Sequence, residues 1–170
     1  DEKLIEVTYK QKRKWQLTGG LQLQEYNQDI YESKPGVPML NTVTPYVDFL
    51  YKISRKKSIR FESQYMITDQ DFGSWAYGLL EVGLAPHWLF ELSGMYNVSP
   101  NVNKNEIPNN PETGEKRKIL YPTLGAVYIN KGNRFSLRYV KQVQGVVCNG
   151  GICRLEPAFS GVRFNMTSNF

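Results

Sequence analysis

The stretch Val162-Arg163-Phe164-Asn165-Met166-Thr167-Ser168-Asn169-Phe170 decides the fold of this 170-residue chain. Positions 162, 164 and 166 are apolar, whereas 163, 165 and 167 are polar or charged. A period of two predicts a β-strand with one apolar face. The stretch closes on an aromatic residue, although the ends of soluble domains tend to be polar and frayed. We therefore expect this strand to turn its apolar face to something other than water.

This stretch resembles the C-terminal signature of bacterial outer-membrane β-barrels, in which an aromatic last residue follows apolar residues two apart. Val162, Phe164, Met166 and Phe170 fit that signature, and Ser168 departs from it. Residues 156–170 are also similar to the ends of uncharacterised Bacteroidota outer-membrane barrels. The resemblance implies an integral outer-membrane protein with a periplasmic C-terminus. It also implies that the barrel-assembly machinery recognises these four residues as an assembly signal, and it transfers no functional residues.

The same period of two recurs along the chain. Segments in which every second residue is apolar (the apolar parity, as opposed to the mixed parity of the residues between) precede the final strand. They cover residues 15–24, 43–53, 59–68, 75–84, 88–97, 119–129 and 135–139. Residues 119–129 fit either parity, because positions 127, 128 and 129 are all apolar. A tilted membrane strand needs about 9–11 residues, close to the length of most of these segments. The pattern predicts an all-β fold, an antiparallel transmembrane β-barrel with eight clear spanning strands.

The connections between these segments alternate in length. Residues 54–57, 85–87 and 130–133 form short connections, whereas 27–42, 69–73, 99–118 and 144–156 form longer ones. Bacterial barrels show the same asymmetry, with short periplasmic turns and longer extracellular loops. The alternation places the end of the last strand on the periplasmic side.

Residues 4–10 also alternate and predict a ninth strand, followed by a short basic turn at 11–14. Bacterial single-chain barrels have even strand counts. A ninth strand therefore predicts that residues 1–170 are one transmembrane domain, the C-terminal part of a larger barrel. The alternative is that residues 4–10 are a periplasmic tail and that eight strands close alone.

A soluble β-sandwich or lipocalin-like barrel alternates in the same way. The outer face of such a soluble protein should be densely charged. Here the positions that alternate with the apolar ones include several large apolar residues instead: Tyr46, Leu50, Trp75, Tyr77, Leu79, Leu89 and Met95. The apolar parity is nearly free of charge, as lipid contact demands. We expect a lipid-facing band made by Leu17, Leu21, Val47, Phe49, Phe61, Leu80, Phe90, Leu92, Leu137 and Phe164.

Composition excludes other classes. No run of about 18 apolar residues is present, which excludes a transmembrane helix. The net charge of +5 is not accompanied by a basic helix or a nucleic-acid-binding motif, so nucleic acid is not an expected partner. The aromatic content of 13% suits the two girdles of a membrane barrel.

Charged residues occur on the mixed parity, which a barrel would turn to its lumen. The predicted lumenal charges are Asp48, Lys52, Arg60, Glu62, Glu81, Glu91, Arg138 and Arg163, joined by Glu6 and Lys10 if residues 4–10 span. They could line a selective pore. They could instead form an ion-pair ladder that holds the barrel together, and the mixed signs favour this second interpretation.

Cys148 and Cys153 flank an Asn-Gly-Gly-Ile segment in the last long connection. Export passes through an oxidising compartment, so a disulfide between the two is expected. A redox or metal role is less favoured, because the spacing is not that of a CxxC motif and no histidine is near.

Catalysis has little support, and no catalytic, cofactor-binding or metal residue is predicted. The single histidine, His87, lies in a short connection beside Trp88. Asp69, Asp71 and the Asn-rich residues 101–110 could supply oxygen ligands to calcium, but a solvated loop is favoured. The expected function is a non-enzymatic structural or accessory component of an envelope complex. Its expected partners are outer-membrane lipid, the barrel-assembly machinery and other envelope proteins. A pore for small solutes is the alternative, and a membrane-embedded enzyme ranks behind both.

Overall fold

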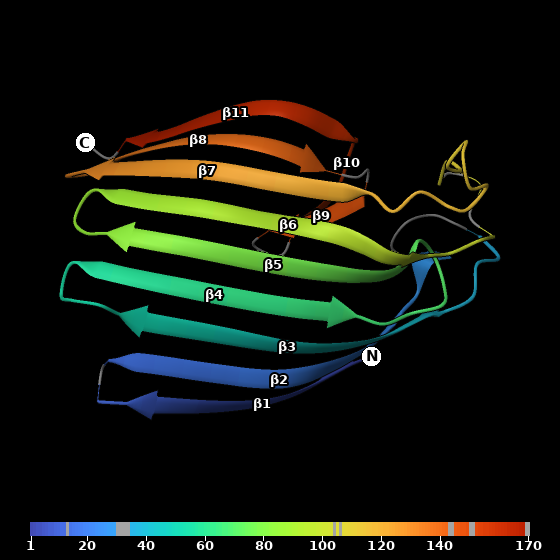
Figure 1. Ribbon diagram of the computed structural model, residues 1–170, viewed down its shortest axis with the longest axis horizontal. Helices are drawn as coiled ribbons and strands as arrows, with labels where there is room; N and C mark the ends of the chain where they lie inside the picture. The colour runs from blue at the N-terminus through green and yellow to red at the C-terminus, as the bar shows by residue number, and fades with distance from the viewer. Residues whose placement is uncertain are drawn as a thin grey trace.

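Nine strands form one antiparallel sheet in the computed structural model (Figure 1). The order across the sheet is β1-β2-β3-β4-β5-β6-β7-β8-β11. These strands are β1 (Glu2–Gln11), β2 (Trp15–Tyr26), β3 (Leu40–Lys52), β4 (Lys57–Met66), β5 (Gly73–Leu84), β6 (Trp88–Pro100), β7 (Leu120–Asn130), β8 (Asn133–Gln142) and β11 (Phe159–Ser168). The two remaining strands, β9 (Gly145–Asn149) and β10 (Ile152–Glu156), form a separate hairpin. The all-β, antiparallel prediction is confirmed.

The structure describes residues 1–12, 14–29, 35–103, 105, 107–142, 145–149 and 152–168, with β9 and β10 described by their backbone alone. Phe170, the aromatic end of the predicted assembly signal, lies outside these residues. Within the described ranges, no helix is long and apolar enough to cross a membrane.

The ninth strand predicted at residues 4–10 is present as β1. It pairs with β2 along its whole length, from Glu2 opposite Gln24 to Gln11 opposite Trp15. The pairing of β6 with β7 shows which residues of β7 lie on the apolar face, because Leu124 lies opposite Leu92 of β6. Val127 is consequently on the other face, where it is 1% exposed.

Short and long connections lie at opposite ends of the sheet (Figure 1). We call the end with connections 12–14, 53–56, 85–87 and 131–132 the short-turn end. The opposite, long-loop end carries connections 27–39, 67–72, 101–119 and the segment between β8 and β11 that contains the β9–β10 hairpin. The predicted alternation of short and long connections is confirmed.

The sheet is open, in contrast to the predicted closed barrel. β1 and β11 are its two edges, each paired with one neighbour. Eight antiparallel steps separate these edges, so β1 and β11 run in the same direction. Joining them directly would require a parallel pair, whereas bacterial barrels are antiparallel throughout.

One face of the sheet, the apolar face, is hydrophobic across all nine strands. Its middle row follows the strand register and contains, from β1 to β11, Tyr9, Leu17, Phe49, Phe61, Leu80, Leu92, Leu124, Tyr139 and Val162. The only polar atoms among these side chains are two tyrosine hydroxyls. The predicted band residues share this face, and Leu92, Leu137 and Phe164 are 53%, 54% and 62% exposed.

The opposite, polar face is the more enclosed one in the middle of the sheet, whereas the edge strand β1 is exposed on both faces. Thr18, Val127 and Ser136 lie on the polar face and are 7%, 1% and 1% exposed. A soluble protein buries its apolar face and exposes its polar one. The distribution here is reversed, since the apolar face is the open one.

Candidate functional site: the charged row of the polar face

Most of the predicted lumenal charges lie in one row across the polar face. We call it the charged row, and its members stand opposite one another in the register: Lys10, Gln16, Leu50, Arg60, Glu81, Glu91, Gly125, Arg138 and Arg163. The two acidic residues at its centre, Glu81 and Glu91, have basic residues on both sides. Asp48 and Glu62 lie opposite each other in the next row.

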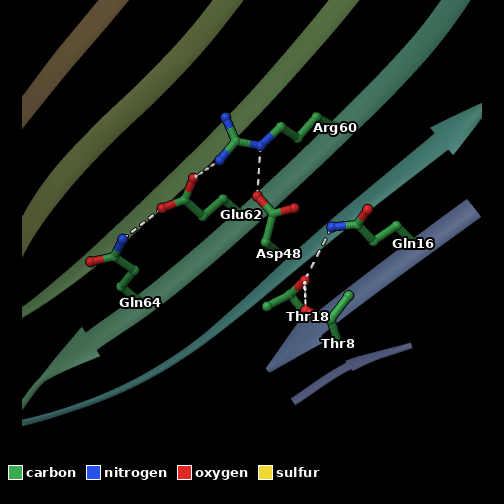
Figure 2. Close-up of polar contacts among 7 residues, drawn as sticks. All are labelled: Thr8, Gln16, Thr18, Asp48, Arg60, Glu62 and Gln64. Carbon is green, nitrogen blue, oxygen red and sulfur yellow. Dashed lines mark hydrogen bonds and ion pairs between the residues drawn. The ribbon is translucent and has the colours of Figure 1, made fainter. Parts of the chain in front are cut away.

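Arg60 is the centre of the first ion-pair cluster (Figure 2). Its Nε donates to Oδ2 of Asp48 and its Nη2 donates to Oε2 of Glu62, both at 2.6 Å. The side chains of Asp48 and Glu62 are 18% and 15% exposed. Two carboxylates thus share one guanidinium that links β3 to β4, and the fork of the guanidinium suits such pairing.

Gln64 extends the Arg60 cluster, and a second hydrogen-bonded group lies on the β1 side of it (Figure 2). Gln64 Nε2 donates to the other carboxylate oxygen of Glu62 at 2.6 Å. Toward β1, Gln16 Nε2 donates to Thr18 Oγ1 at 3.4 Å, and the hydroxyls of Thr8 and Thr18 are 3.0 Å apart. Side-chain hydrogen bonds on the polar face therefore join β1 to β2 through Thr8 and Thr18, and β3 to β4 through Asp48 and Arg60.

The second cluster joins two strands that are not neighbours. Arg138 of β8 reaches over β7 to Glu91 of β6, with Nη2 3.0 Å from Oε2. Gly125 of β7 lies between them in the charged row. A Cβ at this glycine would lie 2.9 Å from Cγ and 3.3 Å from Nε of Arg138. The absence of a side chain on β7 lets the arginine cross.

A similar crossing occurs at the β1 edge. Tyr46 of β3 reaches over Gly20 of β2, and its hydroxyl donates to Oε2 of Glu6 on β1 at 2.5 Å. A Cβ at Gly20 would lie 2.6 Å from the Tyr46 ring. In both places a long side chain passes over a glycine and bonds a glutamate two strands away, which ties three strands together.

The remaining predicted charges take other positions. Glu81 lies opposite both Arg60 and Glu91 in the register. Arg163 donates to Oε1 of Gln142 at 3.3 Å and stands over the Phe159 ring at 5.2 Å from its centroid. Lys52 lies apart, near the short-turn end, where it lines a hollow with other lysines.

The polar face is hollowed beside the Arg60 cluster. A cavity of about 470 Å3 is lined by polar side chains of β1, β2, β3 and β4 together with Leu4: Glu6, Thr8, Gln16, Thr18, Gln22, Tyr46, Asp48, Arg60, Glu62 and Gln64. These side chains include hydrogen-bond donors and acceptors, and charged groups of both signs. The arrangement suits water and internal ion pairing, and it presents no paired nucleophile and base.

The other candidate residues have structural contacts. His87 Nδ1 donates to the carbonyl oxygen of Ile129, 2.8 Å away, and its ring packs on Tyr128. In the long loops, Asn101 Nδ2 donates to the Asp69 carbonyl at 3.2 Å. Among the described residues, no group of three or more His, Cys, Asp or Glu is placed to hold a metal ion.

The two cysteines lie on the hairpin at the long-loop end. The register places Cys148 of β9 directly opposite Cys153 of β10. Their side chains lie outside the described part of the chain, so the disulfide stays a prediction.

Sequence reasoning missed the glycines and tyrosine that make the two crossings. Gly20, Gly125 and Tyr46 carry no charge, and their importance depends on which residue lies opposite which. The only signal in the sequence was a glycine inside a strand, which marks close approach of another group.

Comparisons with known proteins place the chain in a family without giving a function. No curated protein and no solved structure matches it. Residues 1–170 match a family of unknown function, DUF6029, and the chain belongs to that family.

Proposed function

We propose that this chain forms part of the wall of an integral β-barrel in a bacterial outer membrane and acts as a non-enzymatic structural or accessory component of an envelope complex. The observation that carries the proposal is the reversed arrangement of the sheet. The apolar face is exposed over nine strands, while the polar face is the more enclosed one between the two edge strands and carries internal hydrogen bonds. Lipid is a solvent that favours this arrangement.

Aromatic residues at two heights on the apolar face support a membrane position. Trp88 and Tyr96 of β6 are 45% and 40% exposed. They are eight positions apart, about 27 Å along a strand and about 20 Å along the membrane normal once the strand is tilted. This is comparable with the ~25 Å apolar band of outer-membrane barrels, which aromatic girdles flank.

Closure of the barrel requires strands that pair with β1 and β11. Because these edges run in the same direction, antiparallel closure requires an odd number of additional strands. This agrees with the expectation that the nine strands belong to a larger barrel. It also makes the two edges the places where the rest of the wall joins.

The ion-pair clusters favour a structural role over a selective pore. Arg60 and Arg138 are each committed to carboxylates of neighbouring or next-neighbouring strands. Mixed, internally paired charges hold strands together and produce a weak field for a permeating ion. A pore is the second candidate, because the polar face would line an aqueous interior.

Tryptophan quenching tests the membrane orientation. The chain has three tryptophans, of which Trp15 and Trp88 lie on the apolar face and Trp75 on the polar face. Three single-tryptophan variants of the complete barrel, with phenylalanine at every other tryptophan position, would be inserted into vesicles that contain lipids brominated near the top of the acyl chain. We expect quenching of Trp15 and Trp88 and little quenching of Trp75.

Two outcomes would overturn the proposal. Equal quenching at all three positions would exclude the assigned orientation, and the absence of quenching at Trp15 and Trp88 would exclude lipid contact. Planar-bilayer conductance of the same preparation separates the two candidates. Stepwise conductance would favour the pore, whereas an electrically silent inserted protein would favour the structural role.

A further inference from the structure

Basic residues are concentrated at the short-turn end. Residues 11–15, 52–58, 84–88 and 130–134, which form the four short connections and their flanks, contain nine Lys or Arg and no Asp or Glu. The whole chain has a net charge of +5, so the rest of it carries a net charge of −4. The molecule is therefore strongly polarised, with its cationic charge at one end.

Six of these cations surround a hollow. We call the described members that lie in the turns or on the apolar face the basic rim: Lys12, Lys14, Arg55, Lys56, Lys57 and Lys131. The hollow has a volume of about 830 Å3, and Lys12, Lys14, Lys52, Arg55, Lys56 and Lys57 line it from two turns. The turn Ala85–His87 closes its other side. Cations this close repel one another, and a bound anion would relieve that repulsion.

The basic rim borders an aromatic band on the apolar face. One group of rings consists of Tyr9, Trp15, Phe49 and Tyr51, and a second consists of Trp88, Phe90, Tyr128 and Phe135. Lys14 Nζ stands 6.0 Å from the centroid of the Tyr51 ring. Lys57 lies in the same row as Leu84 and Trp88. Rings of this kind mark the depth of lipid headgroups in membrane proteins.

We propose that the basic rim binds the phosphate oxyanions of anionic phospholipid headgroups, in the leaflet whose acyl chains contact the apolar face. The inference rests on the proposed membrane function. Apolar side chains, aromatic rings and cations follow one another toward the short-turn end, in the same order as the acyl chains, interface and headgroups of a leaflet. Lysine and arginine near an anionic surface attract its lipids through charge and hydrogen bonds to phosphate.

The test compares two brominated lipids around Trp88, in the complete barrel with phenylalanine at positions 15 and 75 and at every other tryptophan position. Quenching by brominated phosphatidylglycerol and by brominated phosphatidylcholine, each diluted in phosphatidylcholine vesicles, gives the preference for the anionic headgroup. The rim variant Arg55→Gln/Lys56→Gln/Lys57→Gln removes three cations. The matched control Lys116→Gln/Arg117→Gln/Lys118→Gln removes two lysines and one arginine at the long-loop end.

We expect a preference for phosphatidylglycerol that falls by about fivefold or more in the rim variant, since each cation near the surface contributes about that factor. The control variant should keep the preference, and 1 M salt should remove it. Equal quenching by both lipids in the unsubstituted rim would overturn the inference while leaving the membrane function intact. Absence of quenching by either lipid would instead defeat the membrane function.

A further arm identifies the source of the phosphate. Inorganic phosphate is added in place of chloride at equal ionic strength. An unchanged preference for phosphatidylglycerol supports headgroup binding. Loss of the preference in phosphate alone would show that the rim binds a soluble anion, and would overturn the lipid assignment.

Discussion

Arg138 and Glu91 are joined by a 3.0 Å ion pair although a whole strand separates them. Gly125 on that intervening strand has no side chain to block the arginine, and Tyr46 crosses Gly20 to reach Glu6 in the same manner. In a single-layer sheet each strand contacts only its two neighbours through the backbone. Side chains that span three strands therefore add a stiffness that the backbone ladder cannot supply.

The first prediction concerns Gly125→Val. The added side chain would collide with Arg138 and break its pair with Glu91, because a Cβ alone would lie 2.9 Å from Cγ of the arginine. We expect the free energy of unfolding to fall by about 1–2 kcal/mol, at the low end for a charged hydrogen bond of partly exposed groups. A urea titration of the refolded protein measures it.

Gly78→Val is the matched control, because a Cβ at Gly78 meets nothing within 4 Å. It should leave the urea midpoint nearly unchanged. In a Glu91→Gln background, Gly125→Val should cost less than in the original chain, because the pair is already weakened. An equal cost in both backgrounds would contradict the assigned role of the glycine.

The second prediction concerns the attachment of β1. Tyr46→Phe removes the hydroxyl that donates to Glu6 and keeps the ring over Gly20. We expect faster amide hydrogen exchange throughout β1, with little change in β5 and β6. Tyr65→Phe, which alters the apolar face of β4, is the control, and acceleration of β1 exchange in that variant would contradict the specific role of Tyr46.

The sequence predicted the strands and their faces well, because one apolar face per strand leaves a period of two that needs no knowledge of neighbours. Residues 4–10 are an example: their alternation predicted β1, and the structure contains it. The short connections were equally predictable, since a tight reversal constrains both length and residue type. Even so, residues 119–129 stayed ambiguous until Leu124 was seen opposite Leu92.

The contacts across strands could not be predicted, because they depend on register. Arg60 was expected on the polar face, but its sharing between Asp48 and Glu62 follows from which residues lie opposite one another. Register also explains why Gly125 was missed. Closure of the sheet depends on what pairs with β1 and β11, which periodicity within a strand does not encode.

The third prediction tests the apolar face energetically. Phe61→Arg or Leu92→Arg places a charge in the middle row of that face, where both side chains are exposed, at 46% and 53%. In a lipid bilayer this should lower the free energy of unfolding by about 2–4 kcal/mol. Gln64→Arg, on the polar face of β4, should cost much less, and equal costs would contradict lipid contact.

The fourth prediction concerns Cys148 and Cys153. Residues directly opposite each other in an antiparallel pair have Cα atoms about 4.5–5.5 Å apart, within the range that a disulfide requires. We expect the thiols to resist a maleimide reagent until a reductant is added. Labelling of both thiols in untreated protein would refute the disulfide.

The last prediction concerns the assembly signal on β11. Val162, Phe164 and Met166 are 65%, 62% and 59% exposed and form an uninterrupted apolar stripe on an edge strand. Recognition by strand addition uses the free backbone edge for affinity and alternate side chains for specificity. Phe164→Ser should therefore lower the amount of barrel that reaches the membrane more than it lowers the stability of barrel already inserted.

Phe135→Ser is the matched variant for this prediction. Phe135 of β8 lies opposite Met166, on the same face of the sheet as Phe164, and its substitution removes the same aromatic ring. If Phe164 serves only as a lipid contact, both variants should show normal insertion and similar falls in the urea midpoint. If β11 is the recognised strand, only Phe164→Ser should reduce membrane-inserted protein in cells. Measuring both quantities for both variants separates the two roles, and normal insertion of Phe164→Ser would defeat the assignment of the stripe as an assembly signal.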